Sequence, residues 1–533
     1  MKKVIIVGAG GAGLVAALSA KESGAEVTLI TKEYPTRSQT CMAQGGINAV
    51  LSNECGDSID LHIENTLKSA GGLANEAAVR YMCTEAPLAV KWLDSIGVPF
   101  SRTKEPKIAQ RKLGGAYAPR ACYAQDYTGL KILHTLYDRC LAEGIEILGE
   151  RYLLELITHK RDNKLFVCGV SVLNKRSGEE EIYEAQSIVL ATGGYSRIYD
   201  KYSTNSLSST GDGIAAALRA GAKASDLEFI QFHPTALKNS SILISESARG
   251  AGGYLLNSKG ERFVDELLPR DEVSKAIDEE MEKGEEIFLD IRHLGSEFIE
   301  KELPQEAKLA KLYENADPVS NLIPIKPAAH YTMGGIDVDE NSSTSIEGLY
   351  AAGECANHRV HGANRLGGNS LLEIVVFGRQ AGKNAAEYAK SFDKNLDLKE
   401  KKSVFQKQIS EIKEYTNEMN FYEKQKSLGE LFYKNVGIKR DKTALLGVLD
   451  EVREIKKRLP MMGIGDKTKI CNTNLIEFLE FKNMTELAEL IVISAINRDE
   501  SRGAHYRADA PSRDEKFKAH TIIDREGTLS YEN

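Results

Sequence analysis

The clearest chemical signal in the sequence is a group of glycines close to its start. Gly8-Ala9-Gly10-Gly11-Ala12-Gly13 has the spacing G-x-G-x-x-G and follows the apolar residues 4–7 directly. Glycines at this spacing allow a tight turn and a close approach of the backbone to a pyrophosphate. The charge of the pyrophosphate then faces the N–H groups at the start of a helix. We therefore predict that these glycines bind a dinucleotide.

Two later turns extend this signal. Residues 191–194 (Ala-Thr-Gly-Gly) and Gly353-Glu354 each follow an apolar stretch. Either turn alone could simply end a strand. Together with the first motif they favour FAD over NAD, because an extended FAD molecule needs contacts from several such turns. Thr31-Lys32 stands where many dinucleotide folds have an acidic residue for the ribose, and the Thr31 hydroxyl could take that role.

An alternation of strands and helices must position these turns. A strand at 3–7, a helix at 11–23 and a strand at 26–31 form the first βαβ half of a nucleotide fold. After a long intervening region, the same fold resumes near residue 346. The remaining elements predicted for it are strands at 144–158, 165–173 and 187–191, a strand and turn at 348–354, and a helix over about 370–390.

The chain is therefore expected to form an α/β protein with an insertion. We predict a Rossmann-like FAD-binding domain interrupted by an α+β capping domain and followed by a helical C-terminal domain. The final stretch of the chain is polar and gives no further periodic pattern. The predicted bounds are 1–225 and 346–393 for the FAD-binding domain, 226–345 for the capping domain and 394–533 for the C-terminal domain. Ligands favour the crevice between such lobes.

Composition narrows the class of protein. A length of 533 residues exceeds what one core usually supports, and a net charge of −8 argues against a general nucleic-acid binder. The eight cysteines include no C-x-x-C pair, so the chain carries no visible iron–sulfur or zinc pattern, and reduced intracellular thiols are expected. We see no run near the roughly 20 apolar residues of a spanning helix.

Longer strings resemble the flavoprotein subunits of fumarate reductase and succinate dehydrogenase. They occur in order along nearly the whole chain: 35–40 (PTRSQT), 43–48 (AQGGIN), 126–129 (DYTG), 133–136 (LHTL), 233–235 (HPT), 245–246 (SE), 249–250 (RG), 269–271 (PRD), 330–335 (HYTMGG), 361–370 (HGANRLGGNS) and 500–507 (ESRGAHYR). The resemblance implies an FAD-dependent enzyme that adds or removes two hydrogens across a small dicarboxylate. It also implies an iron–sulfur subunit and, through it, a membrane anchor. The expected location is cytoplasmic, either free or peripheral on the cytoplasmic face of the inner membrane.

The resemblance also assigns catalytic roles. Arg270 would be the proton donor, supplied through Glu246 and Arg249. An arginine is an unusual acid because its pKa exceeds 12, so it can act only on a strong and close base. A dicarboxylate needs cationic or donor groups at both ends, since burying an unpartnered carboxylate is costly. By the resemblance, one end would be held by His233 and Ser245 and the other by His330 and Arg365.

The glycine turns and the resemblance together define a cofactor site. The residues predicted to contact FAD are Gly8, Gly10, Gly11, Gly13, Thr31, Lys32, Ser38, Gln39, Thr40, Gln44, Gly45, Gly46, Ala191, Thr192, Gly193, Asp212, Glu354, Arg365, Ser370 and Leu371. The chain departs from the family at Gln39, where the membrane-bound members have a histidine bonded covalently to FAD. We therefore predict dissociable FAD, whose lower reduction potential would favour fumarate reduction.

Three alternatives are open at this point. L-aspartate oxidase is a relative with non-covalent FAD and the same catalytic scaffold; Gln39 favours it, whereas the helix after Thr128-Gly129 lacks the acidic residue suited to the substrate ammonium. A non-catalytic flavin-binding protein would lack one of the site residues, which are all present. His358 and His361 have the H-x-x-H spacing of a metal site, but no carboxylate or cysteine pattern completes one, and we predict no metal.

Overall fold

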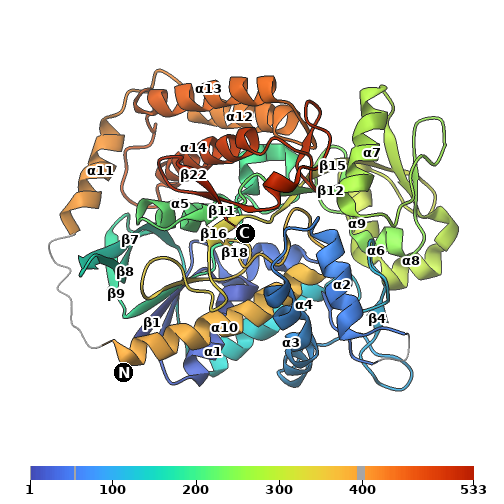
Figure 1. Cartoon of the computed structure of the whole chain (residues 1–533), viewed down its shortest axis with the longest axis horizontal. Helices are drawn as coiled ribbons and strands as arrows, with labels where there is room; N and C mark the ends of the chain where they lie inside the picture. The colour runs from blue at the N-terminus through green and yellow to red at the C-terminus, as the bar shows by residue number, and fades with distance from the viewer. Residues whose placement is uncertain (1, 53–55, 393–401, 533) are drawn as a thin grey trace.

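The computed structural model describes residues 2–52, 56–392 and 402–532, and it confirms the predicted fold class (Figure 1). A parallel five-stranded sheet, in the order β17-β10-β1-β2-β6, forms the base of the nucleotide fold. Its strands are β1 (Lys3–Val7), β2 (Glu26–Ile30), β6 (Glu146–Leu148), β10 (Ser187–Leu190) and β17 (Leu349–Ala351). Because β17 follows the insertion, the chain returns to the sheet that it left.

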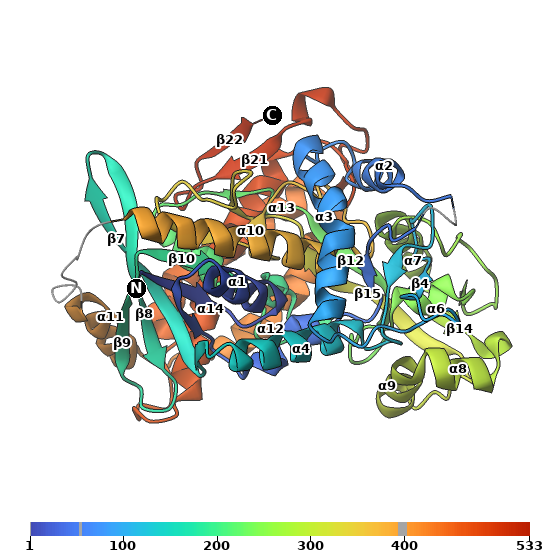
Figure 2. The ribbon, with the colours of Figure 1, turned by 90° about the horizontal axis from the view of Figure 1, so that it is seen from below.

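Strand β1 is apolar from Val4 to Val7 because both faces of this sheet are covered. Val4 and Ile6 pack into a core with the helices of one face, whereas Ile5 and Val7 pack on the other face. Helices α1 and α10 lie side by side on the first face (Figure 2). The helices of that face are α1 (Gly11–Glu22), α3 (Glu76–Ser95), α4 (Thr128–Ala142) and α10 (Asn369–Ser391), with α2 (Ile59–Ser69) packed on α3.

The strand predicted at 144–158 is in fact two strands. β6 ends at Leu148, and β7 (Arg151–Arg161) begins a separate antiparallel sheet with β8 (Lys164–Asn174) and β9 (Glu180–Glu184). Between them Glu150 has a φ of 58°, a left-handed conformation that turns the chain out of the parallel sheet. Gly149-Glu150-Arg151 interrupts the apolar pattern at this turn, and the prediction passed over that interruption.

The insertion forms a lobe at one end of the molecule (Figure 1, right). An antiparallel sheet in the order β12-β15-β14-β13 carries it, and its own apolar core lies between this sheet and its helices. The strands are β12 (Ile230–Leu237), β13 (Tyr254–Leu256), β14 (Ile287–Asp290) and β15 (Ile323–Thr332). The helices are α6 (Glu246–Gly250), α7 (Arg270–Glu282), α8 (Ser296–Glu302) and α9 (Pro304–Glu314).

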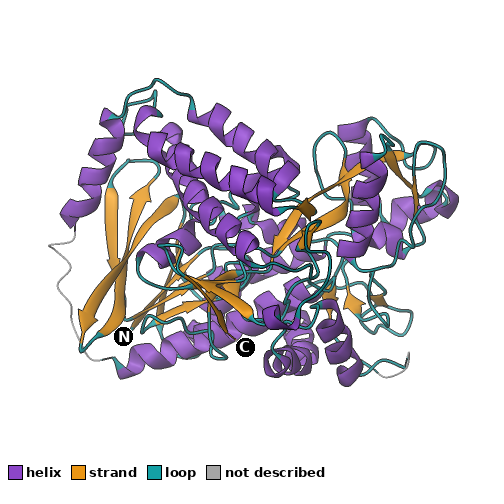
Figure 3. Cartoon of the chain, turned by 45° about the horizontal axis from the view of Figure 1, so that its top comes forward, coloured by secondary structure: helices purple, strands orange, loops and turns teal. Residues whose placement is uncertain are grey.

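The C-terminal region is helical, as predicted, and its helices group on the side away from α10 (Figure 3). They are α11 (Lys402–Glu414), α12 (Phe421–Asn435), α13 (Lys442–Arg458) and α14 (Thr473–Asn497). The polar end of the chain adds two strands that we did not predict, β21 (His520–Ile523) and β22 (Leu529–Glu532). β21 pairs with the two-residue strand β11 (Ala224–Ser225), so its partner lies nearly 300 positions earlier. Among the described helices, none combines the length and apolarity needed to cross a membrane.

Candidate active site

The register of the parallel sheet brings the three glycine turns together. Val7 pairs with Leu190, and Leu190 pairs with Ala351, so the turns after β1, β10 and β17 share one edge. One pocket is lined by these turns, by the matched strings at 35–40 and 43–48, and by the capping lobe. All predicted FAD contacts line this pocket except Gly13, and all predicted catalytic and substrate residues line it except Arg249.

Two glycines of the first motif are required by close packing. Gly8 has a φ of +110°, and a Cβ there would lie 2.1 Å from the carbonyl oxygen of Ala191. A Cβ on Gly13 would lie 1.9 Å from the carbonyl oxygen of Gly8. Gly13 therefore allows helix α1 to pack against the turn, which explains why it does not line the pocket.

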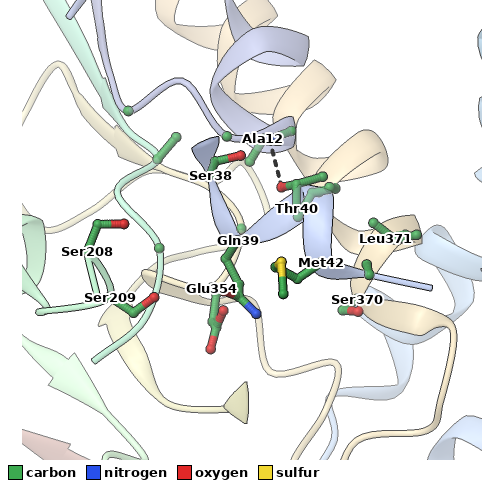
Figure 4. Close-up of a pocket in the computed structure, with 18 of the residues that line it drawn as sticks. Ala12, Ser38, Gln39, Thr40, Met42, Ser208, Ser209, Glu354, Ser370 and Leu371 are labelled. Atoms are coloured by element: carbon green, nitrogen blue, oxygen red, sulfur yellow. Dashed lines mark hydrogen bonds between the residues drawn. The ribbon is translucent and has the colours of Figure 1, made fainter. Parts of the chain in front are cut away.

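The pocket fits a polar ligand such as FAD. Ser38 Oγ, Gln44 Oε1 and Thr192 Oγ1 are buried beside it and have no hydrogen-bond partner within the described part of the chain. Buried polar groups normally have hydrogen-bond partners, so we expect a bound ligand to supply partners for these atoms. Thr40 is already engaged, because its Oγ1 accepts from Gly11 N at 3.0 Å (Figure 4).

The side chain of Gln39 is held by the loop that follows β10. Its Nε2 donates to Asn205 Oδ1 at 3.1 Å, and its Oε1 accepts from Ser206 N at 2.7 Å. Gln39 lies among the residues that line the pocket (Figure 4). Its carboxamide has no ring nitrogen that could form a covalent bond to a flavin.

The opposite end of the pocket contains an ion-pair cluster. Lys32 Nζ lies 2.7 Å from Asp212 Oδ2 and 2.7 Å from Glu480 Oε1 of helix α14. Burial alone would lower the pKa of Lys32, but these two carboxylates raise it. Sequence reasoning missed Glu480, which no motif marks. The Thr31 hydroxyl donates to the carbonyl oxygen of Glu33 at 3.1 Å, so its proton is used locally.

The three predicted catalytic residues form one buried chain of hydrogen bonds. Arg270, the first residue of α7, donates from Nη2 to Glu246 Oε2 at 2.7 Å. Arg249 donates from Nη2 to Glu246 Oε1 at 3.1 Å. Arg270 Nη1 also donates to Gln231 Oε1 at 3.1 Å. Gln231 was missed, although it lies two residues before His233 on the same face of β12, so the period of two could have found it.

The part of the pocket around Arg270, Glu246 and Arg365, called the chamber from here on, carries an excess of positive charge. Burial would raise the pKa of the Glu246 carboxyl, but Arg270 and Arg249 hold it below its usual value. Burial, and then Arg270, lowers the pKa of Arg365 to about 10. Glu354 is the other acidic residue that lines this part of the pocket, and burial raises its pKa to about 7. Three arginines thus face one firmly ionised carboxylate, which suits an anionic ligand.

The two predicted substrate histidines are neighbours. The rings of His233 and His330 have centroids 4.9 Å apart, and burial and the adjacent Arg270 lower the pKa of both well below the usual value. His233 Nδ1 accepts from Thr235 N at 3.2 Å. A neutral ring that accepts at Nδ1 carries its proton on Nε2. His233 is therefore a neutral hydrogen-bond donor.

Arg365 keeps donors available. Its guanidinium lies 4.4 Å from the centre of the Tyr331 ring, and Nη1 donates to Ser370 Oγ at 3.2 Å. Its Nε has no acceptor in the ranges that the structure describes. The H-x-x-H pair is engaged elsewhere: His361 Nε2 lies 3.0 Å from Glu373 Oε2, and His358 Nε2 lies 3.0 Å from Ser342 Oγ.

Comparisons with known proteins cover the whole chain. A family described as FAD binding domain matches residues 3–371, and one described as fumarate reductase flavoprotein C-term matches residues 425–533. The chain is 37% identical to the fumarate reductase flavoprotein subunit of Mycobacterium tuberculosis, with 99% of this chain and 95% of that protein covered. It is 38% identical to the succinate dehydrogenase flavoprotein subunit of Rickettsia bellii, with 99% and 94% covered.

Solved structures give the same result. A quinol-fumarate reductase structure with menaquinol molecules matches with a TM-score of 0.95 and 35% identity, covering 100% of this chain and 98% of that one. Sdh1 of Mycobacterium smegmatis matches with a TM-score of 0.87 and 33% identity, covering 100% and 95%. The aspartate oxidase alternative finds no support among these relatives.

Proposed function

The chain belongs to the fumarate reductase/succinate dehydrogenase flavoprotein family, and on that premise we propose that it interconverts fumarate and succinate with FAD as its redox cofactor. It is an FAD-dependent oxidoreductase acting on a CH–CH bond. The observation that supports this substrate best is the chamber where Arg249, Arg270 and Arg365 outnumber the ionised Glu246 beside the three glycine turns. A small dianion would neutralise this excess.

FAD would be held by the turns at Gly8, Ala191 and Gly353 and by the unpartnered Ser38 and Gln44. When bound, it supplies or receives a hydride. We propose that binding is non-covalent, because Gln39 replaces the linking histidine. Acid precipitation tests this: the yellow colour should leave the pellet, and a yellow pellet would contradict it.

We also propose the domain bounds predicted above. The FAD-binding domain comprises 1–225 and 346–393, the capping domain 226–345 and the C-terminal domain 394–533.

Each end of the substrate would meet two groups. The neutral His233 donates from Nε2, and Ser245 donates from its hydroxyl, to one carboxylate. Arg365, whose Nε has no acceptor in the described part of the chain, and His330 would take the other carboxylate. Burying an anion without such donors would cost several kcal/mol, so the paired ends select a dicarboxylate over a monocarboxylate.

The proton would come from Arg270. In the reductive direction, an Nη proton of Arg270 passes to the substrate carbon that does not receive hydride. Arg249 passes a proton to the ionised Glu246 as Glu246 passes one on to Arg270, along hydrogen bonds of 3.1 and 2.7 Å. Arg249 is then reprotonated from solvent, which completes the cycle. Burial makes this possible, because it excludes water that would otherwise compete for the proton.

We propose that electrons are exchanged with a separate iron–sulfur subunit and through it with a membrane anchor. Relatives named as flavoprotein subunits support this assignment. The protein would then lie at the cytoplasmic face of the inner membrane. Co-purification of the tagged chain from its native membranes tests the assembly: an iron–sulfur protein should accompany it, and recovery of the chain alone would contradict it.

The activity itself is tested with purified protein. Fumarate with reduced viologen should be consumed without oxygen, and L-aspartate with oxygen should not be turned over. Turnover of aspartate but not fumarate would overturn the proposal.

A further inference from the structure

The hydroxyl of Ser245 is held in an unusual way. Ser245 precedes helix α6, and its Oγ lies 3.1 Å from Ser247 N and 2.8 Å from Ser247 Oγ. If Ser247 donates both bonds, both lone pairs of Ser245 Oγ are occupied. The Ser245 proton must then be donated elsewhere, and Ser245 lines the pocket. The direction of the Ser247 proton therefore decides whether Ser245 is a donor to the pocket.

A second acceptor competes for that proton. Glu306 Oε1, in helix α9, lies 3.3 Å from Ser247 Oγ. An ionised carboxylate accepts about twice as strongly as a neutral oxygen. It would draw the Ser247 proton away, and Ser245 would then donate to Ser247 instead of to the substrate. A neutral Glu306 is the weaker and more distant acceptor, so Ser247 would donate to Ser245.

The surroundings of Glu306 keep it neutral. Glu306 and Asp126 are both fully buried, and Glu306 Oε2 and Asp126 Oδ1 have no hydrogen-bond donor among the described residues. The other oxygen of Asp126 accepts from Gln305 N at 2.6 Å. Two adjacent buried carboxyl groups cannot both ionise cheaply, so they share one proton.

The charged and titratable neighbours agree with this. Burial raises the pKa of Glu306 well above its usual value, and Asp126 raises it further, whereas Arg111 opposes the shift. Arg111 balances the single charge of the pair and also interacts with Tyr123 and Glu302, and Tyr127 is a further titratable side chain beside both carboxyl groups.

We propose that Asp126 and Glu306 share one proton and that this pair, acting through Ser247, holds the Ser245 hydroxyl as a donor for a carboxylate of the substrate. The proposal rests on the assignment of Ser245 to the substrate given above. Asp126, Glu306 and Ser247 are positioning residues, since none of them lines the pocket. Asp126 precedes helix α4 of the nucleotide fold, whereas Ser247 and Glu306 belong to the inserted lobe. Asp126 and Glu306 can therefore share a proton only when the lobe is closed on the nucleotide fold.

Two isosteric variants separate this role from simple packing. Asp126→Asn donates an amide hydrogen to Glu306, which then ionises and draws the Ser247 proton. We expect KM for fumarate to rise roughly tenfold with kcat within about twofold, as for loss of one hydrogen bond to a charged group. Glu306→Gln keeps a neutral acceptor for Ser247 and a donor for Asp126, so its KM should stay near the wild-type value. The double variant should recover that value as well.

The measurement is steady-state fumarate reduction by the FAD-loaded protein, with flavin content and Tm recorded for each variant. Glu300→Gln, on the exposed face of α8, is the matched control for loss of a carboxylate. If Asp126→Asn fails to fold, Asp126→Ala should raise KM in the same way, because it also removes the carboxylate that keeps Glu306 neutral. Ser247→Ala should leave KM within about twofold of wild type, because it removes the hydroxyl that would accept the Ser245 proton. Equal KM values for wild type and the Asp126 variants would overturn the proposal, as would a double variant no better than Asp126→Asn. Absence of turnover in the wild type would instead refute the proposed function.

Discussion

Two buried charge clusters in this protein differ in whether their hydrogen-bond donors are used. In the C-terminal region Arg498 pairs with Glu228 at 2.6 Å and with Glu500 at 3.2 Å, and Arg502 pairs with Glu500 at 2.7 Å. The Nη groups of Arg498 also donate to Phe517 O, Ala519 O and Thr521 Oγ1. All five N–H groups of this guanidinium are therefore occupied. In the chamber, by contrast, the Nε of Arg365 has no acceptor among the residues that the structure describes.

The difference separates arginines that hold the fold from arginines that await a ligand. A guanidinium with every donor satisfied has nothing left to bind, and its removal would strand buried carboxylates. A guanidinium that lies among more cations than carboxylates obtains an anionic hydrogen-bond partner only when a ligand binds. Burial alone does not distinguish the two, since Arg365 and Arg498 are both almost fully buried.

The largest effect should come from Arg270→Lys. Lysine cannot reach Glu246 and Gln231 together as the forked guanidinium does, so the acid would be misplaced. We expect kcat to fall by about three orders of magnitude while FAD stays bound, measured by fumarate turnover and flavin absorbance. Arg262→Lys, on the exposed side of the same lobe, should be nearly silent. Residual activity within tenfold of wild type would remove Arg270 from the role of acid.

The next largest effect concerns folding. Arg498→Met leaves Glu228 buried without its cation, while Glu500 keeps Arg502, and this should cost about 3 to 5 kcal/mol of unfolding free energy. Denaturant unfolding measures this, with Arg453→Met as the control, since Arg453 makes an exposed ion pair worth about 1 kcal/mol or less. A variant as stable as wild type would show that satisfied donors do not identify structural arginines.

A smaller effect should appear in the pH dependence of stability. The pKa of Glu354 is raised by burial to about 7 in the folded protein, above the value of the unfolded chain. The contribution of Glu354 to the free energy of unfolding is full below pH 4.5 and is lost as pH rises through 7. The reason is that the carboxyl group releases its proton at lower pH in the unfolded chain than in the folded protein. Relative to Glu354→Gln in the same cofactor state, wild type should lose about 2 kcal/mol between pH 5 and 8. Parallel stability curves would contradict this.

Much of the fold could be predicted because its signals are local. The glycine spacing at residues 8–13 and the apolar strands around it are short-range patterns, and parallel pairing then forces the three turns to one edge. Strand β21 was not predictable, because it depends on a distant partner. The strand break at Glu150 was missed although Gly149-Glu150-Arg151 interrupts the apolar pattern, because a short polar interruption does not show whether a strand continues in the same sheet.

The site divides in the same way. The cofactor, substrate and catalytic residues predicted from the glycine turns and the matched strings line one pocket, apart from Gly13 and Arg249. Glu480 was missed because it meets Lys32 across 448 positions of sequence. Glu306 was missed for a similar reason: its partner Asp126 lies in another lobe, and neither residue stands in a spacing that indicates a shared proton.

The central claim is that the chamber receives a dicarboxylate dianion through its unsatisfied arginine donors. Titration of the FAD-loaded protein with fumarate, followed by the flavin absorbance change, tests it most directly. We expect saturable binding to wild type, and binding weakened by about a hundredfold in Arg365→Gln, with Arg262→Gln unchanged. Identical titrations of wild type and Arg365→Gln, or no response of the flavin to fumarate, would contradict it.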